Sequence, residues 1–98
     1  MSEITNDQAI WLAEIESAII LEYMPFFFAL DHFIFNDILT VQLMVCCKRY
    51  KKQPVNERIK DLFKLINKTN PDILRNINIV IQTYDVEEFE GMIDCEFI

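Results

Sequence analysis

The chain has 98 residues, which is the size of one domain, so we expect a single domain over residues 1–98. One glycine and three prolines argue against a turn-rich β-sandwich, and 52% hydrophobic residues argue against disorder. The net charge of −7 makes general binding of nucleic acid unfavourable, because phosphate contacts need a basic surface.

The N-terminal third predicts two helices. The first runs from about Asp7 to Tyr23, with apolar residues at helical spacing, and Pro25 ends it. The second covers about Pro25 to Phe33 and is apolar nearly all round. Such a run can also form a buried strand, but helical neighbours and the lack of a strand to pair with favour a helix.

The middle of the chain predicts a third helix and then a polar loop. Asn36 is a good helix cap, and the apolar residues up to about Cys47 continue from it, although the Ile38–Val41 segment also has β-propensity. The loop from Lys48 to Gln53 is polar except for Tyr50.

The second half predicts three more helices. Pro54 opens a fourth that ends near Lys68 and has one apolar and one charged face. Asn70 caps a fifth that reaches Tyr84, and Asp85 caps a sixth that ends near Ile93. Six short helices with tight connections predict an all-α, six-helix antiparallel bundle.

Three cysteines, at positions 46, 47 and 95, have no metal-ligand spacing, and we expect them to be reduced thiols in an intracellular protein. The first residues lack the basic region of a signal peptide. The longest uncharged run, Ile38–Cys47, is too short to span a bilayer. We therefore expect a cytoplasmic protein.

No set of residues predicts catalysis. His32 is the only histidine and has no partner nucleophile or second ligand at a recognisable spacing. The glutamates near the two ends are typical of solvated helix faces, and a single glycine excludes a glycine-rich phosphate loop. We expect no enzyme, no cofactor, no metal and no small-molecule substrate.

Eight of the nine lysine and arginine residues lie between Lys48 and Lys68. Tyr50 within this run could stack on a base, the run could simply be solvated, or it could bind acidic residues of a protein. The third interpretation is favoured, because acidic helices of the same molecule could be its complement. Separate patches of opposite charge permit head-to-tail association into a helical oligomer.

The helix spacing resembles the caspase recruitment domain (CARD), a member of the death-fold superfamily with its six-helix Greek-key bundle. The resemblance rests mainly on the Gln53–Ile66 segment with its Leu62-Phe63 pair, on the Asn70–Ile81 segment and on the Val86–Ile93 ending. The Phe35–Leu39 segment is similar to the turn into the third helix of that family.

This resemblance implies a non-enzymatic adaptor that joins other death-fold domains, or copies of itself, in apoptotic or innate-immune signalling. The basic side of the contact would be Lys51, Lys52, Arg58, Lys60 and Lys64. The acidic side would be Asp31 and Asp37, with Glu14 and Glu16 as a second candidate. The alternative is a small viral or decoy bundle that blocks such assembly. We expect Arg58→Glu with Lys64→Glu to keep the fold and abolish binding.

Overall fold

The computed structural model describes residues 4–96, and the side chains of residues 4–93. Its described elements are, in order, α1 (Asn6–Tyr23), β1 (Phe27–Phe35), β2 (Ile38–Cys46), η1 (Lys48–Lys52), α2 (Val55–Thr69), α3 (Pro71–Asn76), β3 (Asn78–Tyr84) and α4 (Val86–Glu96). The strands form one sheet in the order β1-β2-β3. The all-α prediction is therefore wrong, and the fold is α+β.

Helix α1 confirms the first predicted helix. Thr5 is its N-cap and forms a capping box with Gln8. Three aliphatic side chains of α1, from Leu12, Ile15 and Ile19, are buried. The helix ends at Met24, whose φ of 43° places it in the left-handed region.

The predicted second and third helices are instead the antiparallel hairpin of β1 and β2. Asn36 does not cap a helix: Asn36 and Asp37 have φ of 52° and 64°, and they form the two-residue turn between the strands. Two positive φ angles match a type I′ turn, whose twist suits a tight hairpin. The run of aromatic and β-branched residues on each side is typical of strands.

The predicted fourth helix is confirmed as α2, but the predicted fifth helix is only partly correct. Asn70 caps α3 as expected, since its side chain accepts a hydrogen bond from the Asp72 N–H. Helix α3 ends at Asn76, and the remaining residues form β3, which pairs in parallel with β2. Two β-branched residues at Ile79 and Val80 favour the extended conformation there.

Helix α4 begins where the sixth helix was expected. The Asp85 carboxylate accepts from the Glu88 N–H at 2.7 Å, and the Glu88 carboxylate accepts from the Asp85 N–H at 3.0 Å. The predicted cap at Asp85 is therefore confirmed, and it forms a capping box with Glu88. The ring of Phe89 stacks on that of Phe27 with 4.8 Å between centroids, and meets Phe26 edge-on.

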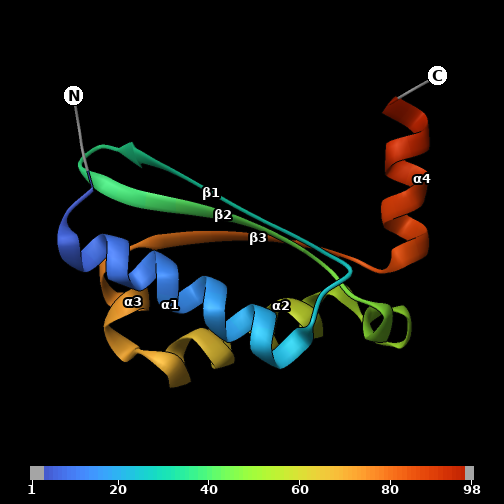
Figure 1. The fold of residues 1–98 in the computed structure, drawn as a ribbon, viewed down its shortest axis with the longest axis horizontal. Helices are drawn as coiled ribbons and strands as arrows, with labels where there is room; N and C mark the ends of the chain where they lie inside the picture. Colours follow the sequence, from blue (N-terminus) through green and yellow to red (C-terminus); the bar gives the residue numbers. More distant parts are fainter. Residues whose placement is uncertain (1–3, 97–98) are drawn as a thin grey trace.

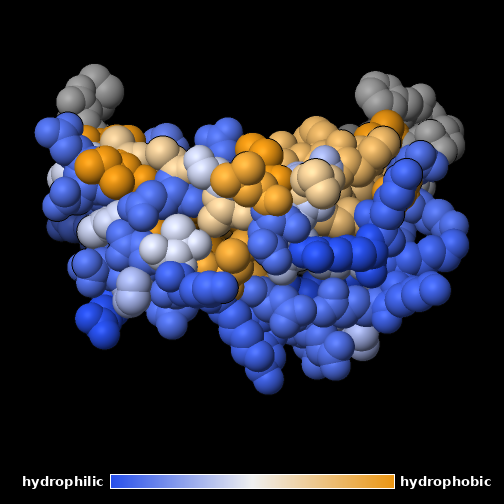
Figure 2. All heavy atoms as spheres, turned by 60° about the horizontal axis from the view of Figure 1, so that its bottom comes forward, coloured by the Kyte–Doolittle hydropathy of each residue, from blue (hydrophilic) through white to orange (hydrophobic). Residues whose placement is uncertain are grey.

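The molecule has two layers, with α1, α2 and α3 on one face of the sheet (Figure 1). Helix α4 stands at one end of the sheet, away from these three helices (Figure 1). The core lies between the layers, and its buried residues are Leu12, Ile15, Ile19, Leu39, Val41, Leu43, Val45, Cys47, Tyr50, Leu62, Ile66, Ile73, Ile77 and Ile81. Figure 2 turns the helical side forward and shows it largely hydrophilic, with hydrophobic residues gathered along the upper part.

Candidate functional site

The face of the sheet opposite the helical layer is open. Side chains alternate between faces along a strand, and the pairing register shows which of them share this face. The open face carries Phe27, Ala29, Asp31, Phe33, Phe35, Ile38, Thr40, Gln42, Met44, Cys46, Asn78, Val80, Gln82 and Tyr84. Helix α4 covers only the end of this face at Phe27, through the stacked ring of Phe89.

Large apolar side chains on this open face meet solvent. Phe35 is 65% exposed, Val80 51%, Ile38 45% and Phe33 44%. Isolated exposed apolar residues are normal on a protein, but these four lie on one continuous surface of three strands. A clustered apolar surface of this kind is typical of a binding site.

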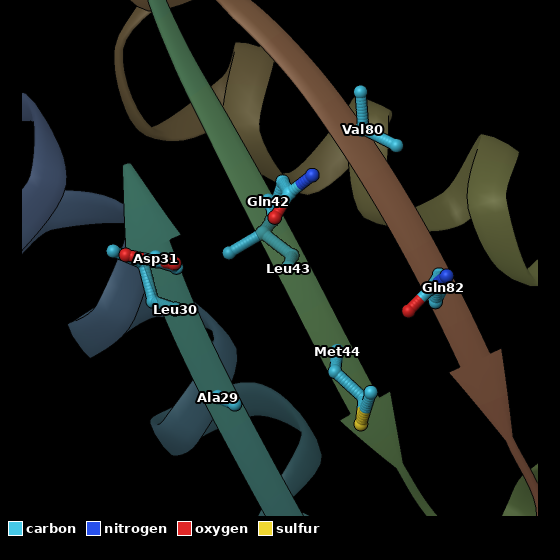
Figure 3. A pocket seen from close by; sticks show the side chains of 8 residues that line it. All are labelled: Ala29, Leu30, Asp31, Gln42, Leu43, Met44, Val80 and Gln82. Carbon is cyan, nitrogen blue, oxygen red and sulfur yellow. The ribbon is translucent and has the colours of Figure 1, made fainter. Parts of the chain in front are cut away.

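A hollow of about 230 Å³ lies in the middle of the open face. Its polar groups are the side chains of Asp31, Gln42 and Gln82, one from each strand (Figure 3). Ala29 and Asp31 are direct neighbours of Met44 and Gln42 across the β1–β2 pair. Ala29, the smallest side chain of β1, is among the residues that line the hollow.

Charge on the open face is confined to one group. Asp31 is its only ionisable carboxylate, and the face carries no lysine or arginine on its strands. The Asp31 carboxylate accepts a hydrogen bond from the His32 backbone N–H at 2.9 Å. On the neighbouring α4, Glu90 is exposed as well. The strands of the open face therefore carry one acidic side chain and no basic one.

Arg58 does not lie on a basic surface patch. It is 5% exposed, it donates to the backbone carbonyls of Tyr50 and Gln53, and its guanidinium forms an ion pair with Glu88 at 3.1 Å. These contacts join η1, α2 and α4. Arg58 is therefore not an exposed interface residue, and we now expect Arg58→Glu to disturb the fold, because a carboxylate there would face two carbonyl oxygens.

The other predicted interface residues lie on separate elements. Lys51 pairs with Glu87 at 2.9 Å, and Glu87 raises the pKa of the Lys51 ammonium. Lys52, Lys60 and Lys64 are exposed on η1 and α2. The structure does not bring these lysines together with the predicted acidic residues.

Each predicted acidic residue has its own surroundings. Glu14 on α1 accepts a hydrogen bond from Asn70 at 3.1 Å, and Glu16 is exposed on the same helix. Asp37 occupies the hairpin turn. Asp31 alone lies on the open face.

Tyr50 cannot stack on a nucleic-acid base, because its side chain is completely buried. The centroids of the Tyr50 and Tyr23 rings lie 6.0 Å apart. The guanidinium of Arg49 lies over the Tyr23 ring, 3.7 Å from its centroid. Burial raises the pKa of both tyrosines. These aromatic residues anchor η1 to α1 rather than forming an exposed site.

Two of the three cysteines, Cys46 and Cys47, are free and buried, as predicted for reduced thiols. The side chain of Cys95 lies outside the described residues. Burial raises the pKa of the Cys47 thiol to about 11, and burial together with nearby carboxylates raises that of Cys46. Neither thiol is therefore activated as a nucleophile.

Within residues 4–96, no cluster of three histidine, cysteine or carboxylate side chains could hold a metal ion. No described helix is both long and apolar enough to cross a membrane.

A second hollow, of about 600 Å³, lies between α1 and α2 beside Ile10, Leu21 and Leu65.

The sequence of β2 indicates a strand with two uncharged faces, although it does not show which face is open. This strand reads Ile-Leu-Thr-Val-Gln-Leu-Met-Val-Cys, with no charged residue on either face. Uncharged strands of this kind are typical of sheets that are covered on both faces. This signal was not used, because the same residues were predicted to form a helix.

A comparison with solved structures finds similarity to the crystal structure of a Bol-like protein from Babesia bovis. The two chains are 11% identical with a TM-score of 0.60, over 93% of this chain and 95% of the other. At this identity the likeness shows the fold alone. No family model matches the chain, and no curated protein matches its sequence.

The resemblance to the caspase recruitment domain is therefore wrong. The similar structure is not a death-fold domain, and the three-stranded sheet has no place in a six-helix bundle. The predicted adaptor function in death-fold signalling depended on that resemblance and is withdrawn with it.

Proposed function

We propose that the chain is a non-catalytic binding module whose open sheet face docks a basic amphipathic helix of a partner protein. The observation that carries this proposal is the exposed apolar surface formed by all three strands, with Asp31 as its one charge.

The composition of the central strand β2 supports the proposal that a partner covers this face. Gln42 is the most polar residue of β2, and apolar residues occupy most positions on both faces of this strand. Burial of apolar surface contributes about 25 cal/mol per Å², so four exposed large side chains give a substantial driving force for docking.

The dimensions favour a helix as the occupant. Strands of nine residues are about 30 Å long, and the outer strands of a three-stranded sheet lie about 10 Å apart. An α-helix with its side chains is about 10 Å wide, and one of 18 residues is about 27 Å long. Helix α1 already covers the opposite face with 18 residues.

Electrostatics favours a basic partner over the other occupants. A phosphate-bearing partner or an anionic membrane would meet Asp31 and Glu90 without any strand lysine or arginine on the face. A second copy of the chain would bring the same carboxylates together, with a net charge of −7 on each molecule.

Selection of displayed 18-residue helical peptides from a random library tests the proposal. A variant with Phe33→Ser and Phe35→Ser serves for counter-selection, since both side chains lie on the open face and are exposed. We expect enriched peptides with one apolar stripe and flanking lysine or arginine, which bind the double variant at least about tenfold more weakly.

Three results would contradict the proposal. Enrichment could be absent, the enriched peptides could bind the double variant equally well, or they could be acidic. Sedimentation of the wild-type chain adds one further outcome: a dimer that the double variant abolishes would make a second copy the occupant instead.

A further inference from the structure

The hollow on the open face has the size of a site for one side chain. Its volume of about 230 Å³ is below the roughly 300–1,000 Å³ of pockets that hold small-molecule ligands. It lies in the middle of the face, where a docked segment would be fully desolvated. An anchor residue of the partner is therefore a better occupant than a free ligand.

Two rows of side chains across the sheet line the hollow. One row is Asp31, Gln42 and Val80, and the adjacent row is Ala29, Met44 and Gln82. Apolar groups of the second row and Val80 can contact a hydrocarbon stem. The carboxylate and the two carboxamides offer oxygen acceptors from three strands (Figure 3).

The carboxylate of Asp31 forms one hydrogen bond to the backbone of its own strand. One of its oxygens accepts the hydrogen bond from the His32 N–H at 2.9 Å, which leaves the other oxygen available. This hydrogen bond also occupies a backbone donor of the edge strand β1, and Asp31 lines the hollow.

We infer that this hollow is a binding site for a single cationic side chain, foremost arginine, of the segment that docks on the open face. The inference rests on the proposed function for the source of that side chain. The guanidinium has five N–H donors and matches an acceptor set of one carboxylate and two amides, while an aliphatic stem packs on Met44 and Val80.

Other occupants fit the hollow less well. An apolar side chain would bury Asp31, Gln42 and Gln82 without partners, and an unpaired buried polar group is costly. An anionic side chain would meet the carboxylate directly. Lysine has the right charge but only three donors in a compact group, so arginine is favoured.

Titration with n-butylguanidinium tests the site without any peptide. The readout is the NMR signals of the Gln42 and Gln82 side-chain amides, and n-pentanol is the neutral probe of similar shape. We expect saturable shifts with the cation, at least about tenfold weaker binding to Asp31→Asn, and no saturable shifts with n-pentanol.

Asp31→Asn keeps the shape of the side chain at an exposed position, so unchanged methyl signals from Leu39 and Val41 on the covered face will show that the fold is retained. Equal binding of the cation to wild type and Asp31→Asn would overturn the inference. So would equal binding of n-pentanol and the cation.

The selected peptides provide the second test. Each lysine or arginine is replaced in turn by norleucine, and affinity is measured with wild type and with Asp31→Asn. We expect one replacement to cost about tenfold or more with wild type and little with Asp31→Asn, which identifies the anchor residue.

The two proposals fail differently. Peptides that bind the open face while no cationic residue couples to Asp31 would overturn the anchor site and leave the docking face intact. The absence of any selected peptide would contradict the docking face, whatever n-butylguanidinium does.

Discussion

The guanidinium of Arg58 is buried where η1, α2 and α4 meet, and its role is structural. The guanidinium supplies donors to the carbonyls of Tyr50 and Gln53 and pairs with Glu88. A buried carbonyl that loses its donor costs about 1–3 kcal/mol. At the level of single residues, the position of a charge along the chain did not reveal whether it was exposed.

We predict that Arg58→Met lowers the free energy of unfolding by about 2–4 kcal/mol, because two carbonyls and one ion pair lose their partner. Urea denaturation measures the change. Lys64→Met is the matched control, since Lys64 is exposed on the same helix, and it should change stability by less than about 0.5 kcal/mol. Equal effects of the two substitutions would refute the role given to Arg58.

The Cys47 thiol makes stability depend on alkaline pH. Its pKa is about 11 in the folded protein, above the ordinary value of 9.0, so the unfolded chain loses this proton first as the pH rises. The unfolded state then binds fewer protons, and stability falls between about pH 9 and 11. We predict that the free energy of unfolding of Cys47→Ala declines less steeply than that of wild type from about pH 8 to 10. In this range Tyr23 and Tyr50, whose ordinary pKa is 10.0, contribute less to the decline. Parallel curves of unfolding free energy would contradict this.

The turn between β1 and β2 shows how one element was misread. The sequence predicts a helix start at Asn36, because asparagine is a good N-cap. Asn36 and Asp37 also tolerate the left-handed conformation that a type I′ turn requires. Only pairing with another strand distinguishes a helix start from a hairpin turn at these residues, and strand pairing is not a local property of the sequence.

Asp37→Gly is predicted to stabilise the protein by up to about 1 kcal/mol, because glycine accepts a φ of 64° without a steric penalty. Asp37→Val should destabilise it, since a β-branched residue is strained at positive φ. Thermal unfolding compares both with wild type. A loss of stability in Asp37→Gly would show that the carboxylate, rather than the backbone, matters here.

The elements that could be predicted from sequence share strong local signals. Helix α2 has a clear apolar stripe, and the caps at Asn70 and Asp85 were identified correctly. The strands were missed because their apolar runs fit a buried helix as well as a strand. The open face could not be predicted either, since it depends on the register that joins β1, β2 and β3.

At the scale of the whole molecule, the two layers separate charge from apolar surface. The lysines of α2 lie with the helical layer, Lys51 of η1 pairs with Glu87 of α4, and the open face of the sheet keeps a single carboxylate. A basic partner would be attracted to a molecule of net charge −7 and then held by apolar contact. Binding should therefore weaken with added salt mainly through slower association.

The most direct measurement is methyl NMR of the full chain with a selected basic helical peptide. If the open face is the docking surface, the signals of Ile38, Met44 and Val80 shift, while those of Ile10 and Leu21 beside the α1–α2 hollow stay unchanged. The reverse pattern, with shifts at Ile10 and Leu21 and none at Ile38, Met44 and Val80, would contradict docking on the sheet.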